Sequence, residues 1–203
     1  MLGLPKNTEV SLPIYKKDLL ANFDGSSKLK EAINSDIQSL RIMNELSTRS
    51  LPVEPSKAIN GIFIVELIPK QQDIHQETIE AIFHLILQHI VIAIHYNDKI
   101  RLAVHHKKTF LTDWLYDSYN LNVSGLSIDE IWMHIVEAIG NFKTSDGQSL
   151  DDQIEHNTEI QAILKNIEKL EKKERNTKTP RIKYELHQKI KALTTKLEAL
   201  KRY

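Results

Sequence analysis

The stretch that decides the fold is Gly61-Ile-Phe-Ile-Val-Glu-Leu-Ile-Pro69, a compact run of β-branched and other apolar residues. A run of this length and composition is typical of a strand that is buried on both faces, and Pro69 marks its end. Helical spacing of apolar residues over 76–90 and a β-branched segment over 91–96 follow it. A strand, a helix and a strand in this order predict a right-handed parallel crossover. We therefore expect two neighbouring parallel strands in a central sheet.

The next segment predicts an antiparallel partner for this pair. Asn97-Asp98 is a two-residue turn signal, and residues 99–106 alternate between apolar and polar side chains. The apolar side chains from Ile100 to Val104 are expected on one face, and the row from Lys99 to His105 on the outward face. Further strands are predicted at 41–50 and 109–116.

Helices are predicted at 27–40, 76–90 and 127–140 from apolar residues three and four apart. For the last helix, Ser127 fits the N-cap, Glu130 completes a capping box, and Gly140 stands where the helix terminates. The predicted order is α-β-β-α-β-β-β-α. The predicted fold class is α+β, with a mixed sheet of about five strands and packed helices.

The composition changes after a polar linker at 141–150. Residues 151–203 contain no Gly and a single Pro, and their apolar residues follow two heptad seams, namely Ile160, Ile163, Ile167 and Leu170, then Leu186, Ile190, Leu193, Leu197 and Leu200. Pro180 suits the first turn of a second helix. The predicted domains are therefore an α+β domain at 1–140, the linker at 141–150, and an antiparallel coiled-coil helical hairpin at 151–203.

Composition excludes several classes of protein. The 203 residues include no Cys, which excludes disulfides, thiolate nucleophiles and Cys-ligated zinc or iron–sulfur sites. No apolar run approaches the ~20 residues that span a bilayer, and the N-terminus lacks the order of a signal peptide. A soluble cytoplasmic protein without membrane contact is the expectation.

The formal net charge of zero hides a strong asymmetry. From Lys165 onward the chain carries 13 Lys and Arg against five Asp and Glu, a net charge of +8, whereas residues 1–164 carry a net charge of −8. Such segregation favours association with an acidic partner or with nucleic acid. The candidate contact residues cluster near the predicted hairpin tip: Lys165, Lys169, Lys172, Lys173, Arg175, Lys178, Arg181 and Lys183.

A second basic feature is the outward row of the 99–106 strand. Lys99, Arg101 and Lys107 form a cationic strip that suits a phosphate backbone. The alternative is a solvated sheet face, or an edge strand that its charges keep from pairing. Aromatic residues do not interleave the strip, so the two interpretations stand level.

No cofactor or metal site is predicted. The chain has no Gly-x-Ser-x-Gly, Gly-x-Gly-x-x-Gly or Gly-x-x-x-x-Gly-Lys motif, and no His-Glu-x-x-His. Among the nine His, His95 and His105 flank the Asn97-Asp98 turn and form the one plausible cross-strand pair. The simpler interpretation, which we prefer, is two half-exposed strand residues.

An enzymatic alternative is a Mg²⁺-dependent nuclease of the restriction-enzyme type. Glu45 and Glu66 would hold the ion from adjacent strands, with Lys70 as the basic residue. The Glu-x-Lys pattern of such enzymes is broken, because Leu67 and Ile68 follow Glu66. The chain is therefore expected to be non-enzymatic, with no catalytic residues.

Several segments carry a family resemblance: Met1-Leu-Gly-Leu-Pro5, Ile64-Val-Glu-Leu-Ile68, the helix to Ile90, Ile92-Ala-Ile-His-Tyr-Asn-Asp98, and Arg101-Leu-Ala-Val-His-His-Lys107 running on to Asp113-Trp114. In these the chain resembles domain-of-unknown-function family 4391, an uncharacterised bacterial and archaeal family. The resemblance implies an accessory member of gene clusters with DNA helicases and methyltransferases, as in restriction-modification and phage defence. It carries over no catalytic residues.

These observations predict an accessory or interaction subunit of a DNA-processing or phage-defence complex. Its basic hairpin would contact a protein partner, a helicase or methyltransferase, or DNA. A homodimer formed through exposed hairpin faces is a third possibility, because the sequence leaves the oligomeric state open.

Overall fold

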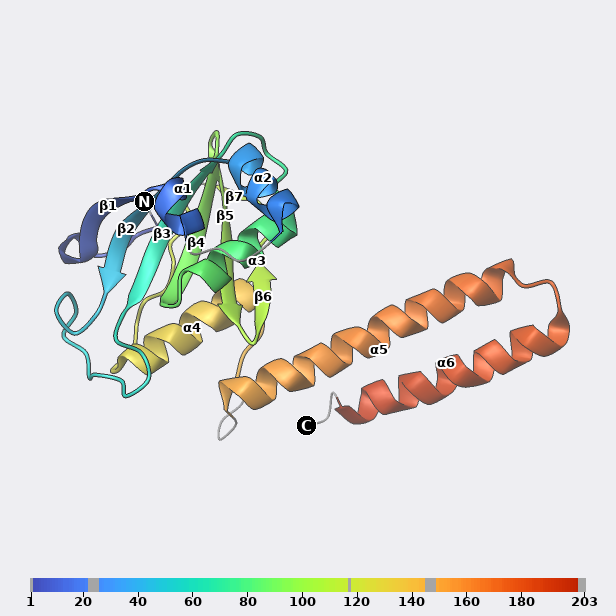
Figure 1. The fold of residues 1–203 in the computed structure, drawn as a ribbon. Coiled ribbons are helices and arrows are strands. Elements are labelled where there is room, and N and C mark those ends of the chain that lie inside the picture. The colour runs from blue at the N-terminus through green and yellow to red at the C-terminus, as the bar shows by residue number, and fades with distance from the viewer. Residues whose placement is uncertain (1, 22–25, 117, 145–148, 201–203) are drawn as a thin grey trace. The chain divides into compact units, whose positions relative to one another are not determined.

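A single mixed sheet organises the N-terminal part of the chain (Figure 1). Its strands lie in the order β1-β2-β3-β4-β5-β6, and β7 pairs with β5. β3 and β4 run parallel, and the other strand pairs of the described residues run antiparallel. The strands are β1 (Glu9–Ile14), β2 (Ile37–Leu46), β3 (Ile62–Pro69), β4 (His89–Tyr96), β5 (Lys99–His106), β6 (Lys108–Leu111) and β7 (Leu115–Tyr116).

The computed structural model describes residues 2–21, 26–116, 118–144 and 149–200. The chain divides into two units, Met1–Lys143 and Thr144–Tyr203. Helices of the first unit are the short 3-10 helix η1 (Lys6–Thr8), α1 (Lys16–Ala21), α2 (Ser27–Asp36), α3 (Gln76–Leu85) and α4 (Ile128–Gly140). The second unit consists of α5 (Leu150–Asn176) and α6 (Pro180–Leu200). The predicted linker includes residues 145–148, which lie outside the described part of the chain.

Helices cover both faces of the sheet in the first unit. The side chains of α2 and α3, including Ile33 and Ile82, pack on one face with Val65 and Ile92 of the parallel pair. α4 contacts β5 and β6 and buries Trp132 among its apolar residues. β3 and β4 are therefore buried on both sides, as their continuous apolar sequence predicts.

Several local predictions are confirmed. The 62–69 and 89–96 strands are parallel, and the Asn97-Asp98 turn joins β4 to an antiparallel β5, with Asn97 in the left-handed region at φ +53°. Ser127 caps α4 by accepting a hydrogen bond from the Glu130 backbone N–H, and α4 ends at Gly140. The Glu130 carboxylate accepts from the N–H of Leu126, one residue earlier than a capping box requires.

The prediction of about five strands is wrong, because the sheet has seven. β1 was not predicted: it is an exposed edge strand that contains Pro13 and, at Ser11, a residue with positive φ, so it lacks the features of a regular half-buried strand. The predicted 109–116 strand is two short strands, and the break between them begins at Thr112. The Thr112 backbone N–H donates to the carbonyl oxygen of Leu102, but the Thr112 hydroxyl, not its carbonyl oxygen, accepts from the Leu102 N–H.

Two predicted helices are also too long. α2 ends at Asp36 rather than at residue 40, so β2 starts at Ile37 and not at residue 41. α3 ends at Leu85 rather than at residue 90, and β4 starts at His89. In both cases the apolar spacing that predicts a helix continues into a strand that is buried on its inner face. Periodicity alone does not separate the two states over a few residues.

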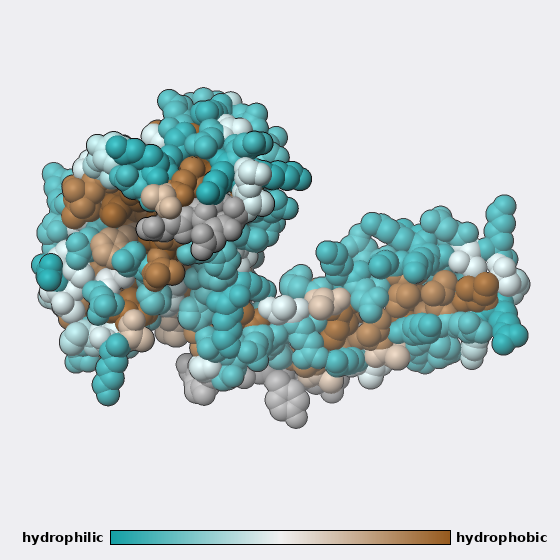
Figure 2. All heavy atoms as spheres, viewed as in Figure 1, coloured by the Kyte–Doolittle hydropathy of each residue, from teal (hydrophilic) through white to brown (hydrophobic). Residues whose placement is uncertain are grey.

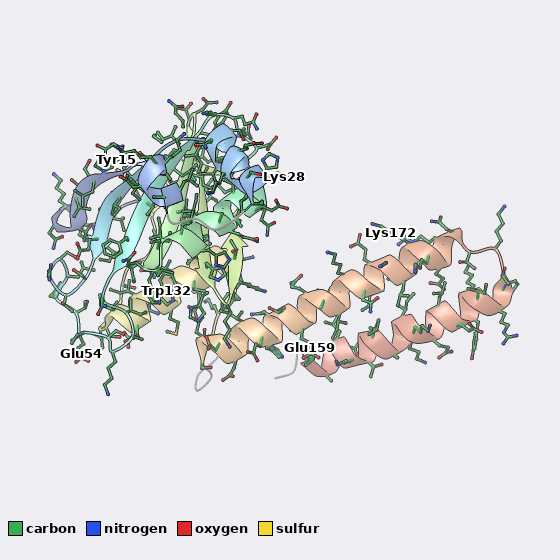
Figure 3. All side chains as sticks on the ribbon, viewed as in Figure 1. Tyr15, Lys28, Glu54, Trp132, Glu159 and Lys172 are labelled. Carbon is green, nitrogen blue, oxygen red and sulfur yellow. The ribbon has the colours of Figure 1, made fainter. Side chains whose placement is uncertain are left out.

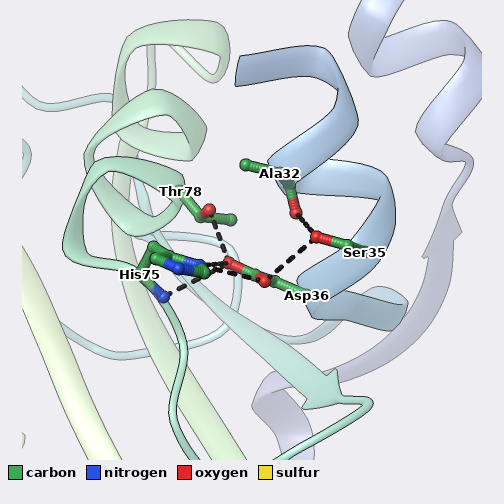
Figure 4. Close-up of polar contacts among 5 residues, drawn as sticks. All are labelled: Ala32, Ser35, Asp36, His75 and Thr78. Carbon is green, nitrogen blue, oxygen red and sulfur yellow. Dashed lines mark hydrogen bonds and ion pairs between the residues drawn. The ribbon is translucent and has the colours of Figure 1, made fainter. Parts of the chain in front are cut away.

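A buried carboxylate fixes the end of α2 against the start of α3 (Figure 4). Asp36 is 0% exposed, and its oxygens accept hydrogen bonds from the backbone N–H of His75, from the Thr78 hydroxyl at 2.8 Å and from the Ser35 hydroxyl. The ring Nδ1 of His75 lies 2.9 Å from the carboxylate. His75 is the N-cap residue of α3 and makes no side-chain cap of its own, so the Asp36 carboxylate ties the first residues of α3 to the end of α2.

These hydrogen bonds keep Asp36 ionised. Burial raises the pKa of the Asp36 carboxyl, but the hydrogen bonds from His75 and Thr78 outweigh burial and hold the pKa below its ordinary value. A buried carboxylate with four donors satisfies its charge and orders the residues that donate. Asp36 therefore adds a specific polar contact to the apolar packing that positions the β3–α3–β4 crossover against α2.

None of the helices among the described residues combines the length and the apolar composition that crossing a bilayer requires.

We expect Asp36→Asn to lower the free energy of unfolding by about 2 kcal/mol or more, because the amide presents a donor where the carboxylate accepts several hydrogen bonds. Asp73→Asn is the matched control, since Asp73 is exposed in the same β3–α3 connection. Its effect should stay within about 0.5 kcal/mol. Urea unfolding of both variants measures the difference, and equal losses would contradict the role of Asp36.

The pH dependence of stability follows from the sign of the Asp36 pKa shift. A carboxyl whose pKa is lower in the folded state stabilises the fold above its unfolded pKa of about 3.9, and this contribution is lost as the pH falls through the folded pKa. The wild-type chain should therefore lose stability below about pH 4 more steeply than Asp36→Asn. Unfolding midpoints over an acidic pH series test this, and parallel curves would refute it.

Candidate functional site

The second unit is a helical hairpin in which α5 and α6 lie side by side and antiparallel (Figure 3). Polar contacts fix their register along the length. Lys196 pairs with Glu159 at 2.7 Å, His187 Nδ1 lies 3.4 Å from Glu174, and the ring of His156 bonds with the carbonyl oxygen of Leu200. The turn at 177–179 therefore forms the tip of this unit.

Two helices bury their shared seam incompletely. Of the nine predicted seam residues, Ile163 and Leu197 are buried, whereas the others are half-buried: Ile160, Ile167, Leu170, Leu186, Ile190, Leu193 and Leu200. Two further apolar side chains beside the seam, Leu164 and Ile182, are 37% and 47% exposed. The hairpin thus presents apolar surface along its length, since two helices cover only one stripe of each other.

All eight predicted basic residues of the hairpin are exposed, but they differ in their partners. Three form ion pairs one helical turn apart: Lys172 with Glu168, Arg175 with Glu171, and Arg181 with Glu185. Exposed pairs of this kind contribute little to stability and partly neutralise the cation. Lys169, Lys173, Lys178 and Lys183 form no ion pair within the described residues.

The structure gathers three of the predicted lysines around one hollow near the tip, which we call the tip hollow. It has a volume of about 480 Å³ and is lined by Lys169, Lys172, Lys173, Asn176, Thr177, Ile182 and Leu186. Its apolar side chains come from α6 and its lysines from α5. The sequence predicts the lysines but not the hollow, because Ile182 lies four residues before the first seam leucine of α6 and outside the assigned heptads.

The expected cationic strip on β5 does not form a continuous surface. Its face is the one that α3 covers, so Ala103 is buried and the His105 ring stacks on Phe83. Arg101 donates from Nε to the carbonyl oxygen of Thr112 at 2.7 Å. The expectation that this row faces outward is therefore wrong, because helices cover both faces of β5.

The two exposed lysines of the strip lie far apart. Lys99 begins β5 and Lys107 follows its end, in the left-handed region at φ +58°. Eight residues of strand separate them by roughly 25 Å. They therefore do not form one contiguous basic patch.

The carboxylates of the nuclease alternative project from opposite faces of the sheet. Glu45 pairs with Phe63, and Glu66 pairs with Arg41. Directly paired residues share a face, whereas Phe63 and Glu66, three residues apart on β3, point to opposite faces. Lys70 donates to the carbonyl oxygen of Asn34. The arrangement that would hold one Mg²⁺ between Glu45 and Glu66 therefore does not form.

Glu66 has a different partner. Its carboxylate is buried and accepts a hydrogen bond of 2.6 Å from Nε of Arg41, whose side chain is 44% exposed. This hydrogen bond and the charge of Glu66 raise the pKa of Arg41. The pair links β2 to β3 and satisfies the buried charge, which is a structural role.

The histidines of the two central strands lie apart from each other. His95 pairs with Ile100, at the turn, whereas His105 lies at the far end of β5 beside His84, with ring centroids 5.8 Å apart. Burial, followed by the neighbouring His84, lowers the pKa of His105. Within the described ranges no group of three or more His, Asp or Glu side chains can hold a metal ion.

Comparison with known proteins identifies the family from the whole chain. The sequence model described as Domain of unknown function (DUF4391) matches residues 2–197. The chain belongs to the DUF4391 family. The match spans the sheet unit and most of the hairpin, so both are parts of the family's domain. No curated protein and no solved structure matches the chain.

Glu66→Gln should lower the free energy of unfolding by about 1–3 kcal/mol, because it removes the charged acceptor of Arg41 inside the sheet. Glu45→Gln is the control, since Glu45 lies on a neighbouring strand and on the other face, and we expect a change within about 0.5 kcal/mol. Thermal and urea unfolding measure both. Similar losses in the two variants would show that the Arg41–Glu66 contact contributes no more to the free energy of unfolding than Glu45 does.

Proposed function

We propose that this member of the DUF4391 family is a non-enzymatic accessory subunit of a bacterial DNA-processing or phage-defence assembly, similar to restriction-modification systems, and that it binds its partner through the basic hairpin. The observation that carries the proposal is the group of exposed lysines near the tip that have no ion pair among the described residues: Lys169, Lys173, Lys178 and Lys183.

Unpaired lysines favour an acidic partner. Their charge is not shared with a neighbouring carboxylate, so they attract an acidic surface over a Debye length and accelerate encounter with it. From Lys165 onward the chain has a net charge of +8 against −8 in the rest, so an acidic partner is attracted to the C-terminal segment and repelled by the rest of the chain. Binding of this kind weakens as the salt concentration rises.

The family context supports a partner that works on DNA. The resemblance to this family implies gene clusters with DNA helicases and methyltransferases. Both these enzymes and the DNA on which they act are candidate partners for the basic hairpin. The two carboxylates of the nuclease alternative, Glu45 and Glu66, point to opposite faces of the sheet. The nuclease alternative therefore has no observation in its favour.

The test measures the affinity of the full chain for a helicase or methyltransferase encoded in the same gene cluster, and for duplex DNA. The triple variant Lys169→Gln, Lys173→Gln and Lys183→Gln removes three of these four charges while it keeps side chains that favour helix. We expect it to weaken binding to the true partner by about tenfold or more at moderate salt.

The matched control is Lys6→Gln, Lys28→Gln and Lys57→Gln, which removes the same charge from exposed positions of the sheet unit. It should change the affinity by about twofold at most. Equal losses in the two triple variants, or no binding to either protein or DNA, would contradict the proposal.

A further inference from the structure

The tip hollow combines an apolar floor with a basic rim. Ile182, 47% exposed, and the half-buried Leu186 come from α6, and Lys169, Lys172 and Lys173 come from α5. The stems of lysine side chains pack along apolar surface while their ammonium groups remain in water. The hollow therefore offers two kinds of contact to one partner, apolar burial at its base and charge at its margin.

Apolar surface continues from the hollow along the hairpin. Figure 2 shows a hydrophobic stripe between hydrophilic margins in this unit. The seam residues Leu170 and Ile190 are half-buried, so part of their apolar surface is exposed. A third helix laid along two antiparallel helices covers such a stripe, because its side chains fit the grooves between theirs. A helix that binds here would place one apolar side chain in the tip hollow and others along the seam.

The lysines beside the hollow favour acidic residues on either side of the apolar face of that helix. Lys169 and Lys173 have no ion pair within the described residues, and they flank the hollow on its α5 side. Glu or Asp residues on either side of the partner's apolar stripe would complement them, as in other pairings that charge selects. Basic or uncharged borders would leave these lysines uncompensated.

Duplex DNA fits this hollow less well than a protein helix. Phosphates would satisfy the lysines but would leave Ile182 and Leu186 uncovered, and none of the seven lining residues is an aromatic ring on which a base stacks. Burial of apolar area is a contribution that only a partner with apolar side chains gains here.

We infer that the tip hollow is a docking site for an amphipathic helix of a partner protein, with apolar residues along one face and acidic residues beside them. This inference rests on the proposed function and specifies its partner. In this site Ile182 makes the main contact with the apolar face of the helix, and the unpaired lysines pair with the acidic residues beside that face.

The probe is a synthetic helical peptide of about 20 residues, long enough to form an isolated helix, with leucines one turn apart bordered by glutamates. A second peptide carries serines in place of the leucines, and a third probe is duplex DNA of similar length. Fluorescence anisotropy with the full chain should show about tenfold or greater preference for the leucine peptide over the serine peptide.

Variants of α6 assign the binding to the hollow. Ile182→Ser should weaken binding of the leucine peptide by about tenfold, whereas Tyr184→Ser, which changes another exposed residue of the same helix outside the hollow, should change it by about twofold at most. Circular dichroism checks that both variants keep their helices.

The outcomes separate this inference from the proposed function. Equal binding of the two peptides, equal effects of the two variants, or binding of DNA alone overturns the helix-docking site. In the last case, a loss of DNA affinity in the tip lysine variant keeps the proposed function with nucleic acid as the partner. If the tip lysine variant binds every partner as tightly as the wild type, the proposed function fails as well.

Discussion

The ionised carboxylate of Asp36 is the constraint on which the sheet unit depends. It lies at the end of α2, is buried, and accepts hydrogen bonds from residues that begin α3, about forty positions later in the chain. Because a buried charge without donors is costly, the chain has to bring these donors to it. The contact joins the end of α2 to the start of α3, the helix of the parallel crossover whose strands form the centre of the sheet.

Predictions succeeded where the determinants are local. The parallel pair, the Asn97-Asp98 hairpin and the cap at Ser127 follow from short runs of residues, and the structure confirms them. Predictions failed where a distant residue decides. The apolar spacing of α2 continues past Asp36 into a strand that forms because β3 pairs with it, and β1 is an exposed edge strand held by its pairing with β2.

The site shows the same division. Composition and spacing predict the concentration of basic residues in the hairpin and the change to long helices, because both depend only on residue types and their spacing along the chain. The ion pairs that neutralise some of these cations join residues four apart on one helix, so they follow from spacing as well. The apolar hollow beside Ile182 requires the register of two helices. The strip on β5 and the Glu45–Glu66 pair were misleading because sequence alternation does not show that both faces of a strand are covered, or that the register of two strands places residues on opposite faces.

We propose a structural role for the sheet unit and a binding role for the hairpin. Hydrogen exchange of the full chain, with and without a bound helicase or methyltransferase partner, tests this division most directly, because it reports protection along the whole backbone. We predict that the partner increases protection at the α5–α6 tip, around 165–190, and leaves β3 and β5 unchanged. Protection that rises at β3, around Glu66, with the tip unchanged would contradict the account.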